Sequence, residues 1–153
     1  MNNLDKLKSC ALEINNLLNK YVELHNKVLK EAGTFRSVFR KVDFQGLYNE
    51  AKILSNDFMS KEIEIRELGN EINNSLTSLQ KEFFDCTLGY FEALLKTVDL
   101  LFRKIELLYN RSQNKETLSW NNFNRISKEY NESINGYLEF GTNLNKLYKE
   151  MFV

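Results

Sequence analysis

The side chains that most often do chemistry are few in this chain of 153 residues. It has one histidine, His25, and two cysteines, Cys10 and Cys86, which are far apart in the sequence. A structural zinc site uses four cysteine or histidine ligands, and a di-iron bundle uses two Glu-x-x-His motifs. The sequence provides neither set, so we expect no metal centre and no cofactor.

Nucleotide chemistry and acid–base catalysis are not indicated either. The six glycines form neither a GxGxxG motif nor a phosphate loop. Four glutamates between residues 62 and 71 could work as acids and bases, but Lys61 and Arg66 lie among them. Such mixed charge is typical of a solvated helix face. We therefore expect a protein that is not an enzyme.

Composition excludes several further classes. Lys plus Arg and Asp plus Glu are 21 each, and this zero balance argues against nucleic-acid binding, which needs excess positive charge. The chain shows no secretory signal and no apolar run of about 18 residues that could span a membrane. With two cysteines in no paired spacing, we expect reduced, buried thiols and a cytoplasmic location.

The absence of proline and the scarcity of glycine favour long helices. From Leu4 to Val28 the apolar residues alternate spacings of three and four, which predicts a helix from about residue 3 to 32. His25 lies on this apolar stripe. We expect a buried, neutral imidazole bonded to a Tyr or Asn across the bundle; the alternatives are a pH switch and a metal ligand.

From Phe44 to Ile72 the apolar residues keep a seven-residue repeat in which Lys61 is a misfit. The pattern falters between Gly69 and Ser78, where Thr77 and Gln80 have the spacing of a capping box. We expect two antiparallel helices, about 44–72 and 76–111. The alternative is one bent helix of roughly 65 residues.

A last helix is expected from about Ser119, with the same alternation of apolar residues up to Met151. The fold class is therefore predicted to be all-α. The architecture is an antiparallel bundle of four long helices with a short amphipathic helix between the first and the second, and residues 1–153 form a single domain.

The segment 83–109 has a wider apolar surface than one helix of a bundle needs. One apolar column repeats every seven residues and comprises Leu88, Leu95, Phe102 and Tyr109. We predict that this column is the interface with a second protein chain. The alternative is that the short helix at 35–42 covers it.

That short segment interleaves aromatic and basic residues: Phe35, Arg36, Phe39, Arg40 and Lys41. We expect it to be a lid that closes one end of the bundle. A contact with an anionic membrane surface or RNA is the alternative, although three charges over two turns are too few for stable binding.

These patterns favour a non-enzymatic helical-bundle protein that acts through protein–protein interaction, in an adaptor, chaperone-like or inhibitory role. We expect it to self-associate, with a homodimer favoured; the identity of a further protein partner does not follow from the sequence. The alternative is a small apolar ligand or lipid held between the helices. Its expected lining is aromatic and comprises Tyr90, Phe91, Phe102, Tyr130, Tyr137 and Phe140.

Overall fold

The computed structural model describes residues 1–31, 42–113 and 119–153. These ranges contain four long α-helices and one 3₁₀ turn, and no strand occurs within them. The elements are α1 (Asn3–Glu31), α3 (Phe44–Ile72), η1 (Asn73–Ser75), α4 (Ser78–Ser112) and α5 (Trp120–Phe152). The predicted all-α class is confirmed.

The boundary between α3 and α4 lies where the sequence pattern falters, so the alternative of one continuous helix is wrong. Thr77 caps α4: its Oγ1 accepts a hydrogen bond from the Gln80 amide at 3.3 Å. The Gln80 side chain in turn accepts from the Thr77 amide at 3.1 Å. This predicted capping box satisfies two amides that lack helical partners and starts the new helix.

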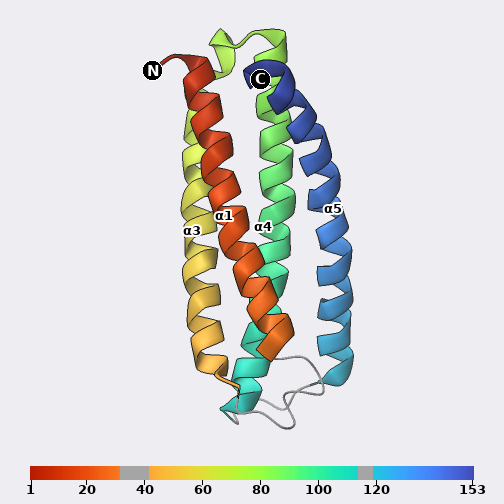
Figure 1. Ribbon diagram of the computed structural model, residues 1–153. Helices are drawn as coiled ribbons and strands as arrows, with labels where there is room; N and C mark the ends of the chain where they lie inside the picture. Colours follow the sequence, from red (N-terminus) through yellow and green to blue (C-terminus); the bar gives the residue numbers. More distant parts are fainter. Residues whose placement is uncertain (32–41, 114–118) are drawn as a thin grey trace.

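The helices lie side by side along most of their length, and the chain reverses direction from each one to the next (Figure 1). Helix α4 is the central element and packs against α1, α3 and α5. In Figure 1, α1 crosses in front of α4, while α3 and α5 lie on either side. The core therefore forms around the inward faces of α4.

The core is one continuous apolar cluster, with large, fully buried side chains from α1, α3 and α4 and buried tyrosines from α5. Phe58 of α3 and Phe91 of α4 are both 0% exposed, and their rings stack at 5.6 Å. Burial of one such side chain stabilises the fold by about 1.5–3 kcal/mol. The period of apolar residues in the sequence thus defines which face of each helix is buried.

Helices α4 and α5 approach each other closely at two glycines. A Cβ at Gly89 of α4 would lie 2.7 Å from the Phe140 ring of α5. A Cβ at Gly141 of α5 would lie 3.2 Å from the Tyr90 ring of α4. At both places a glycine of one helix therefore packs against an aromatic ring of the other. The missing Cβ atoms allow the two backbones to lie close together.

Helices α1 and α3 are joined by ion pairs that follow the heptad repeat. On α1 the paired residues are seven apart. On α3, Glu71, Asp57 and Glu50 fit a seven-residue repeat that runs in the opposite direction, and Lys61 lies three residues from the regular position. The pairs are Lys6–Glu71, Glu13–Lys61, Lys20–Asp57 and Lys27–Glu50. Lys61 also pairs with Glu64, which occupies the regular heptad position. We call this set the α1–α3 ion-pair ladder.

Lys61, the misfit of the apolar repeat, is explained by the ladder. Its side chain is 14% exposed and contacts both Glu13 and Glu64. Burial alone disfavours the charged ammonium, but the two carboxylates outweigh it and raise the pKa of Lys61. The pKa of Glu13 is lowered, chiefly by its hydrogen bond from Lys61. The carboxylates of Glu13 and Glu64 therefore offset the cost of partly burying the charged Lys61 side chain at the edge of the core.

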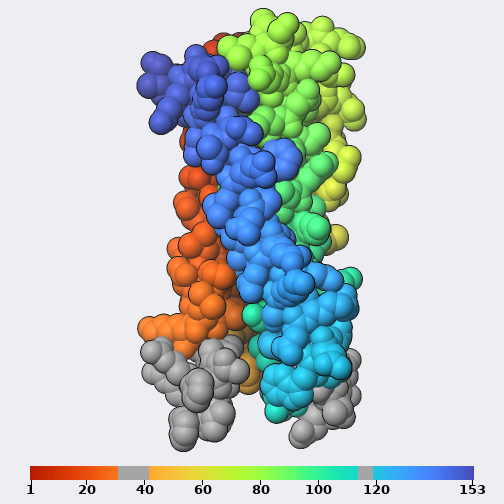
Figure 2. Space-filling model, turned by 90° about the vertical axis from the view of Figure 1, so that its right-hand side faces the viewer, coloured from red at the N-terminus to blue at the C-terminus, as the bar shows by residue number. Residues whose placement is uncertain are grey.

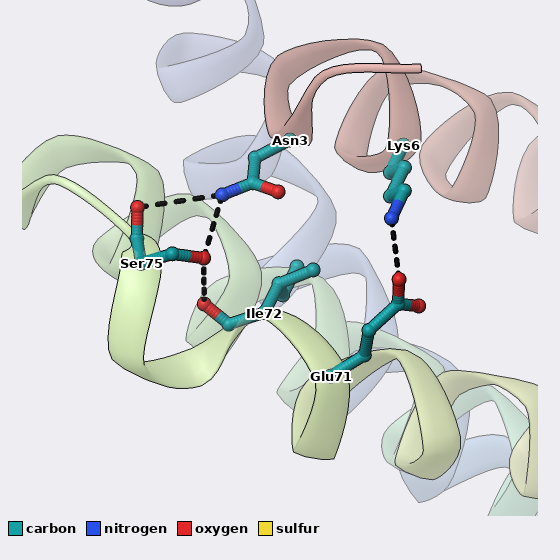
Figure 3. Close-up of polar contacts among 5 residues, drawn as sticks. All are labelled: Asn3, Lys6, Glu71, Ile72 and Ser75. Atoms are coloured by element: carbon teal, nitrogen blue, oxygen red, sulfur yellow. Dashed lines mark hydrogen bonds and ion pairs between the residues drawn. The ribbon is translucent and has the colours of Figure 1, made fainter.

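The ladder continues to the end of the two helices, where polar contacts join α1 to η1 (Figure 3). The Asn3 amide nitrogen donates to the Ser75 hydroxyl at 2.8 Å, and this hydroxyl donates to the Ile72 carbonyl at 2.9 Å. About one helical turn further along α1, the Lys6 ammonium and the Glu71 carboxylate lie 2.5 Å apart. These contacts satisfy polar groups at the end of α3.

Candidate functional site

The four residues of the predicted interface column on α4 are all half-buried. Leu88, Leu95 and Phe102 pack against the core cluster. Tyr48 of α3 stacks on Phe102 at 5.6 Å and on Tyr109 at 4.6 Å. Helix α3 therefore covers part of this column. The covering residue is a tyrosine that sequence analysis did not single out.

Next to this column, α4 presents a charged strip to solvent. Its exposed members are Glu92, Lys96, Asp99 and Arg103, which alternate in sign along the helix. They line a surface groove of about 680 Å³ together with Leu95, Leu100, Phe102, Glu106 and Glu129. Partial burial raises the pKa of Asp99, Arg103 opposes this shift and Glu62 adds to it.

The predicted lid falls outside the part of the chain that the structure describes. The structure does not describe residues 32–41, which include the whole predicted lid: Phe35, Arg36, Phe39, Arg40 and Lys41. Most of the short helix expected between the first and second long helices lies outside the described residues for the same reason. Both remain predictions.

His25 takes part in a polar cluster at the contact of α1 with α5. Its Nδ1 lies 2.5 Å from the Tyr130 hydroxyl, which also lies 2.8 Å from the Tyr21 hydroxyl. Tyr21 and Tyr130 are buried, whereas the imidazole is half-buried. The predicted hydrogen bond to a tyrosine across the bundle is confirmed, but burial of the ring is only partial.

The surroundings of this cluster favour the neutral imidazole. Burial lowers the pKa of His25, and the positive charge of Lys104 lowers it further. The Lys104 ammonium lies 5.8 Å from the Tyr130 ring centroid, and burial lowers its own pKa. Burial also raises the pKa of Tyr130 to about 12, although the bond to Tyr21 opposes this shift. At neutral pH the cluster is a set of neutral hydrogen-bonding groups beside one ammonium.

Between α1 and α5, above the point where the polar cluster joins them, lies a groove of about 320 Å³. Its walls come from both helices and its floor includes a ring of α4. The lining residues are Ala11, Leu12, Asn15 and Leu18 of α1, Tyr90 of α4, and Gly141, Leu144, Asn145 and Tyr148 of α5. None of them is charged. Figure 2 shows α5 crossing this side of the molecule, with α1 along its edge.

Beyond the groove, the same helix faces continue with apolar residues in one direction. In the other direction Lys8 precedes Asn15 by seven, and its ammonium lies 5.7 Å from the Phe152 ring of α5. Val22 and Leu29 follow Asn15 at intervals of seven on α1, and Leu138 precedes Asn145 by seven on α5. Residues seven apart lie on the same helix face. Val22, Leu29 and Leu138 are exposed, Leu29 and Leu138 by more than half. We call the groove and these three residues the α1–α5 face.

Other exposed apolar residues lie in a different setting. On α3, Ile53, Met59 and Ile63 are exposed, but Lys52, Glu64 and Glu67 lie among them. On α1, the charges of the ion-pair ladder face α3, and the groove itself has no charged lining residue. The α1–α5 face is therefore an extended surface where apolar and asparagine side chains meet.

Sequence analysis missed the α1–α5 face because it followed the apolar stripes that form the core. Leu12, Val22, Leu29 and Leu138 lie off those stripes. Their signal was present as leucine and valine at positions where a solvated helix face usually carries charge. Only the structure shows that the two helices bring these residues together.

The cysteines are both free. Cys10 is buried, and burial raises its pKa to about 11 against the opposing charge of Lys61. Cys86 is half-buried, so the expectation of two buried thiols holds for Cys10 alone. Across the described ranges, no cluster of three or more His, Cys, Asp or Glu residues has the geometry to hold a metal ion.

None of the helices that the structure describes is long and apolar enough to cross a membrane. In comparisons with protein-family models, with curated proteins and with solved structures, nothing matches this chain.

Proposed function

We propose that this protein acts by binding another protein, without catalysis, and that it does so through the α1–α5 face. The observation that carries the proposal is the groove between α1 and α5, which has no charged lining residue and is continued by Val22, Leu29 and Leu138. An adaptor, chaperone-like or inhibitory role is compatible with such a surface.

The size of the face supports this assignment. Leu12 and Leu29 are 17 residues apart, which is about 25 Å along the helix. Two neighbouring helices, each about 10 Å wide, make a surface of roughly 500 Å². Asparagines lie among the apolar side chains, so the apolar part of this area is smaller than the whole. Exposed apolar patches of a few hundred Å² often mark interaction sites.

We also propose the finer architecture expected from the sequence: a single-domain antiparallel bundle with coiled-coil-like packing, located in the cytoplasm. The heptad spacing of the ion-pair ladder supports coiled-coil packing between α1 and α3. A partner that fits the α1–α5 face is an amphipathic helix with an uncharged apolar stripe, because it would lie in the groove as a further helix of the bundle.

Site-specific photo-cross-linking tests the proposal in cells that naturally produce the protein. A photoreactive phenylalanine analogue replaces Leu12 in the groove or, as a control, Ile53 on α3. We expect one protein to be cross-linked from position 12 and not from position 53. The product should disappear when Leu18→Glu adds a charge to the groove. Equal products from both positions would contradict the assignment of this face.

The groove also supports a second candidate, the binding of a small apolar molecule. Its volume of about 320 Å³ lies at the lower end of ligand sites, and Tyr90 of the expected aromatic lining contributes to it. Native mass spectrometry of protein purified from its natural source tests this candidate. A bound small molecule that is lost in the Asn15→Trp variant, whose side chain fills the groove from its exposed rim, would favour ligand binding over protein binding.

A further inference from the structure

The charged strip of α4 has a pattern that is its own complement when the helix direction is reversed. Glu92, Lys96, Asp99 and Arg103 alternate in sign and are all exposed. With 3.6 residues per turn, their directions fall within a sector of about 60° around the helix axis. They therefore point to the same side of the molecule and can meet one surface together.

These four residues are placed symmetrically about a point between Thr97 and Val98. Lys96 and Asp99 are equally far from that point, and so are Glu92 and Arg103. If a second α4 lies antiparallel and is centred on the same point, each acidic side chain of these four faces a basic one. Asp85 and Glu106, at the two ends of the strip, then face the uncharged residues Asn110 and Gly89. If it lies parallel, each charge faces its own copy, and like charges at such distances repel.

We propose that the protein forms a homodimer in which the exposed face of α4 packs antiparallel against α4 of a second copy. Lys96 lies opposite the partner's Asp99, and Glu92 lies opposite the partner's Arg103. The two-fold axis repeats both contacts, which gives four ion pairs across the interface. Such an arrangement is isologous, as is usual for homodimers.

Neighbouring side chains supply the apolar part of the interface. Leu95 and Phe102 lie beside the charged strip, are half-buried and line the same groove. Exposed ion pairs add little affinity on their own, so these apolar side chains provide the attraction and the charges set the orientation. The sequence predicted that the column containing Leu95 and Phe102 faces a second chain. The charge pattern adds that this chain is a second copy whose α4 lies antiparallel, centred between Thr97 and Val98.

Within each copy, Arg66 and Arg103 interact weakly with the acidic residues that would pair across the interface. Arg66 of α3 lies 3.9 Å from Glu92, which is at the limit of an ion pair. Arg103 interacts with Asp99 along the helix, yet burial still raises the pKa of the Asp99 carboxyl. A lysine from a second copy would stabilise that carboxylate where its own chain does so only in part.

This interface is separate from the α1–α5 face, because α1 packs on the other side of α4 (Figure 1). The dimer proposal therefore does not depend on the proposed function. A variant of one surface leaves the other intact, so the two proposals fail separately.

Sedimentation velocity of the full chain, from about 1 μM to 500 μM, tests the dimer. We expect a concentration-dependent shift from 18.1 kDa to twice that mass, with weaker dimerisation at high salt. Lys96→Glu should raise the dissociation constant about tenfold or more, because it replaces two attractions with two repulsions. Asp99→Lys should act in the same way.

The charge-swapped double variant, Lys96→Glu with Asp99→Lys, is the decisive arm. In an antiparallel dimer it restores both contacts, so its dissociation constant should return to within about threefold of the original. The matched control is Lys128→Glu on α5, which also reverses one exposed lysine and should have no effect. A monomer at every concentration, single variants that dimerise like the original, or a double variant that is not rescued would each overturn the proposal.

Discussion

The hydroxyl of Tyr130 is the shared member of the polar cluster, and its removal is the most direct test of that cluster. In Tyr130→Phe the ring and its packing remain while two contacts are lost: 2.8 Å to Tyr21 and 2.5 Å to His25. A hydrogen bond within a protein contributes about 0.5–1.5 kcal/mol, so the expected loss is about 1–3 kcal/mol.

The environment of each remaining group narrows this range. The Tyr21 side chain is 1% exposed, so its hydroxyl has little access to water and suffers most from the loss. It also interacts with Tyr137, which limits the penalty. The half-buried imidazole of His25 can be hydrated. We therefore expect about 1–2 kcal/mol, which corresponds to a fall in Tm of roughly 2–8 °C for a domain of this size.

Urea and thermal unfolding, followed by circular dichroism at pH 7.5, measure this loss. The matched control is Tyr148→Phe, whose ring packs against Phe83 and Phe152. We expect it to change stability by less than about 0.5 kcal/mol. The double variant Tyr21→Phe/Tyr130→Phe should cost less than the two single variants together, by about 0.5–1.5 kcal/mol. If Tyr130→Phe behaves like the control, our account of the cluster is refuted.

Three further predictions concern the imidazole, the ladder and the glycine contact. The lowered pKa of His25 means that the unfolded chain binds a proton first as pH falls through about 6.5, so stability should fall between about pH 7 and 5. His25→Leu should reduce this slope in urea unfolding; equal slopes would contradict a neutral His25. Lys61→Glu should lower the free energy of unfolding by at least about 1 kcal/mol, because it places a third carboxylate beside those of Glu13 and Glu64. Adding Glu13→Lys to this variant should recover part of the lost stability in the same assay. In a Phe140→Ala background, Gly89→Ala should stabilise the protein by about 1 kcal/mol, because alanine has the higher helix propensity and no ring is in its way. With Phe140 present, the same substitution should be neutral or destabilising, because the new methyl group meets the ring. Equal effects in both backgrounds would argue against the close contact of Gly89 with Phe140.

The helices themselves could be predicted closely from the sequence because their signals are local. The three-four spacing of apolar residues defined each buried face, and Thr77 with Gln80 marked the start of α4. Ser119 likewise caps α5 where the last helix was expected to begin. Hydrogen bonds between neighbours in the chain decide such boundaries, so a single sequence contains the information.

The surfaces were harder to predict because they depend on how far apart the helices lie. The α1–α5 groove remains open while α4 and α5 are drawn together at Gly89 and Gly141. A glycine in a helical sequence does not reveal which ring it will meet. The stacking of Tyr48 on Phe102 and Tyr109 is likewise a contact between helices, and no period within either helix indicates it.

The ion-pair ladder has a consequence for the evolution of this chain. Three of its pairs place lysine on α1 and an acid on α3, and these would tolerate a shift of α1 by one heptad. The reversed pair would not, because Glu13 would then face Asp57 or Glu71. The register of α1 against α3 therefore depends on the one pair with the acid on α1, Glu13–Lys61. A substitution at one of these positions should be accompanied by a substitution at the other. In descendants of this sequence we expect the two positions to exchange charge as a pair, while single replacements at either one are removed by selection.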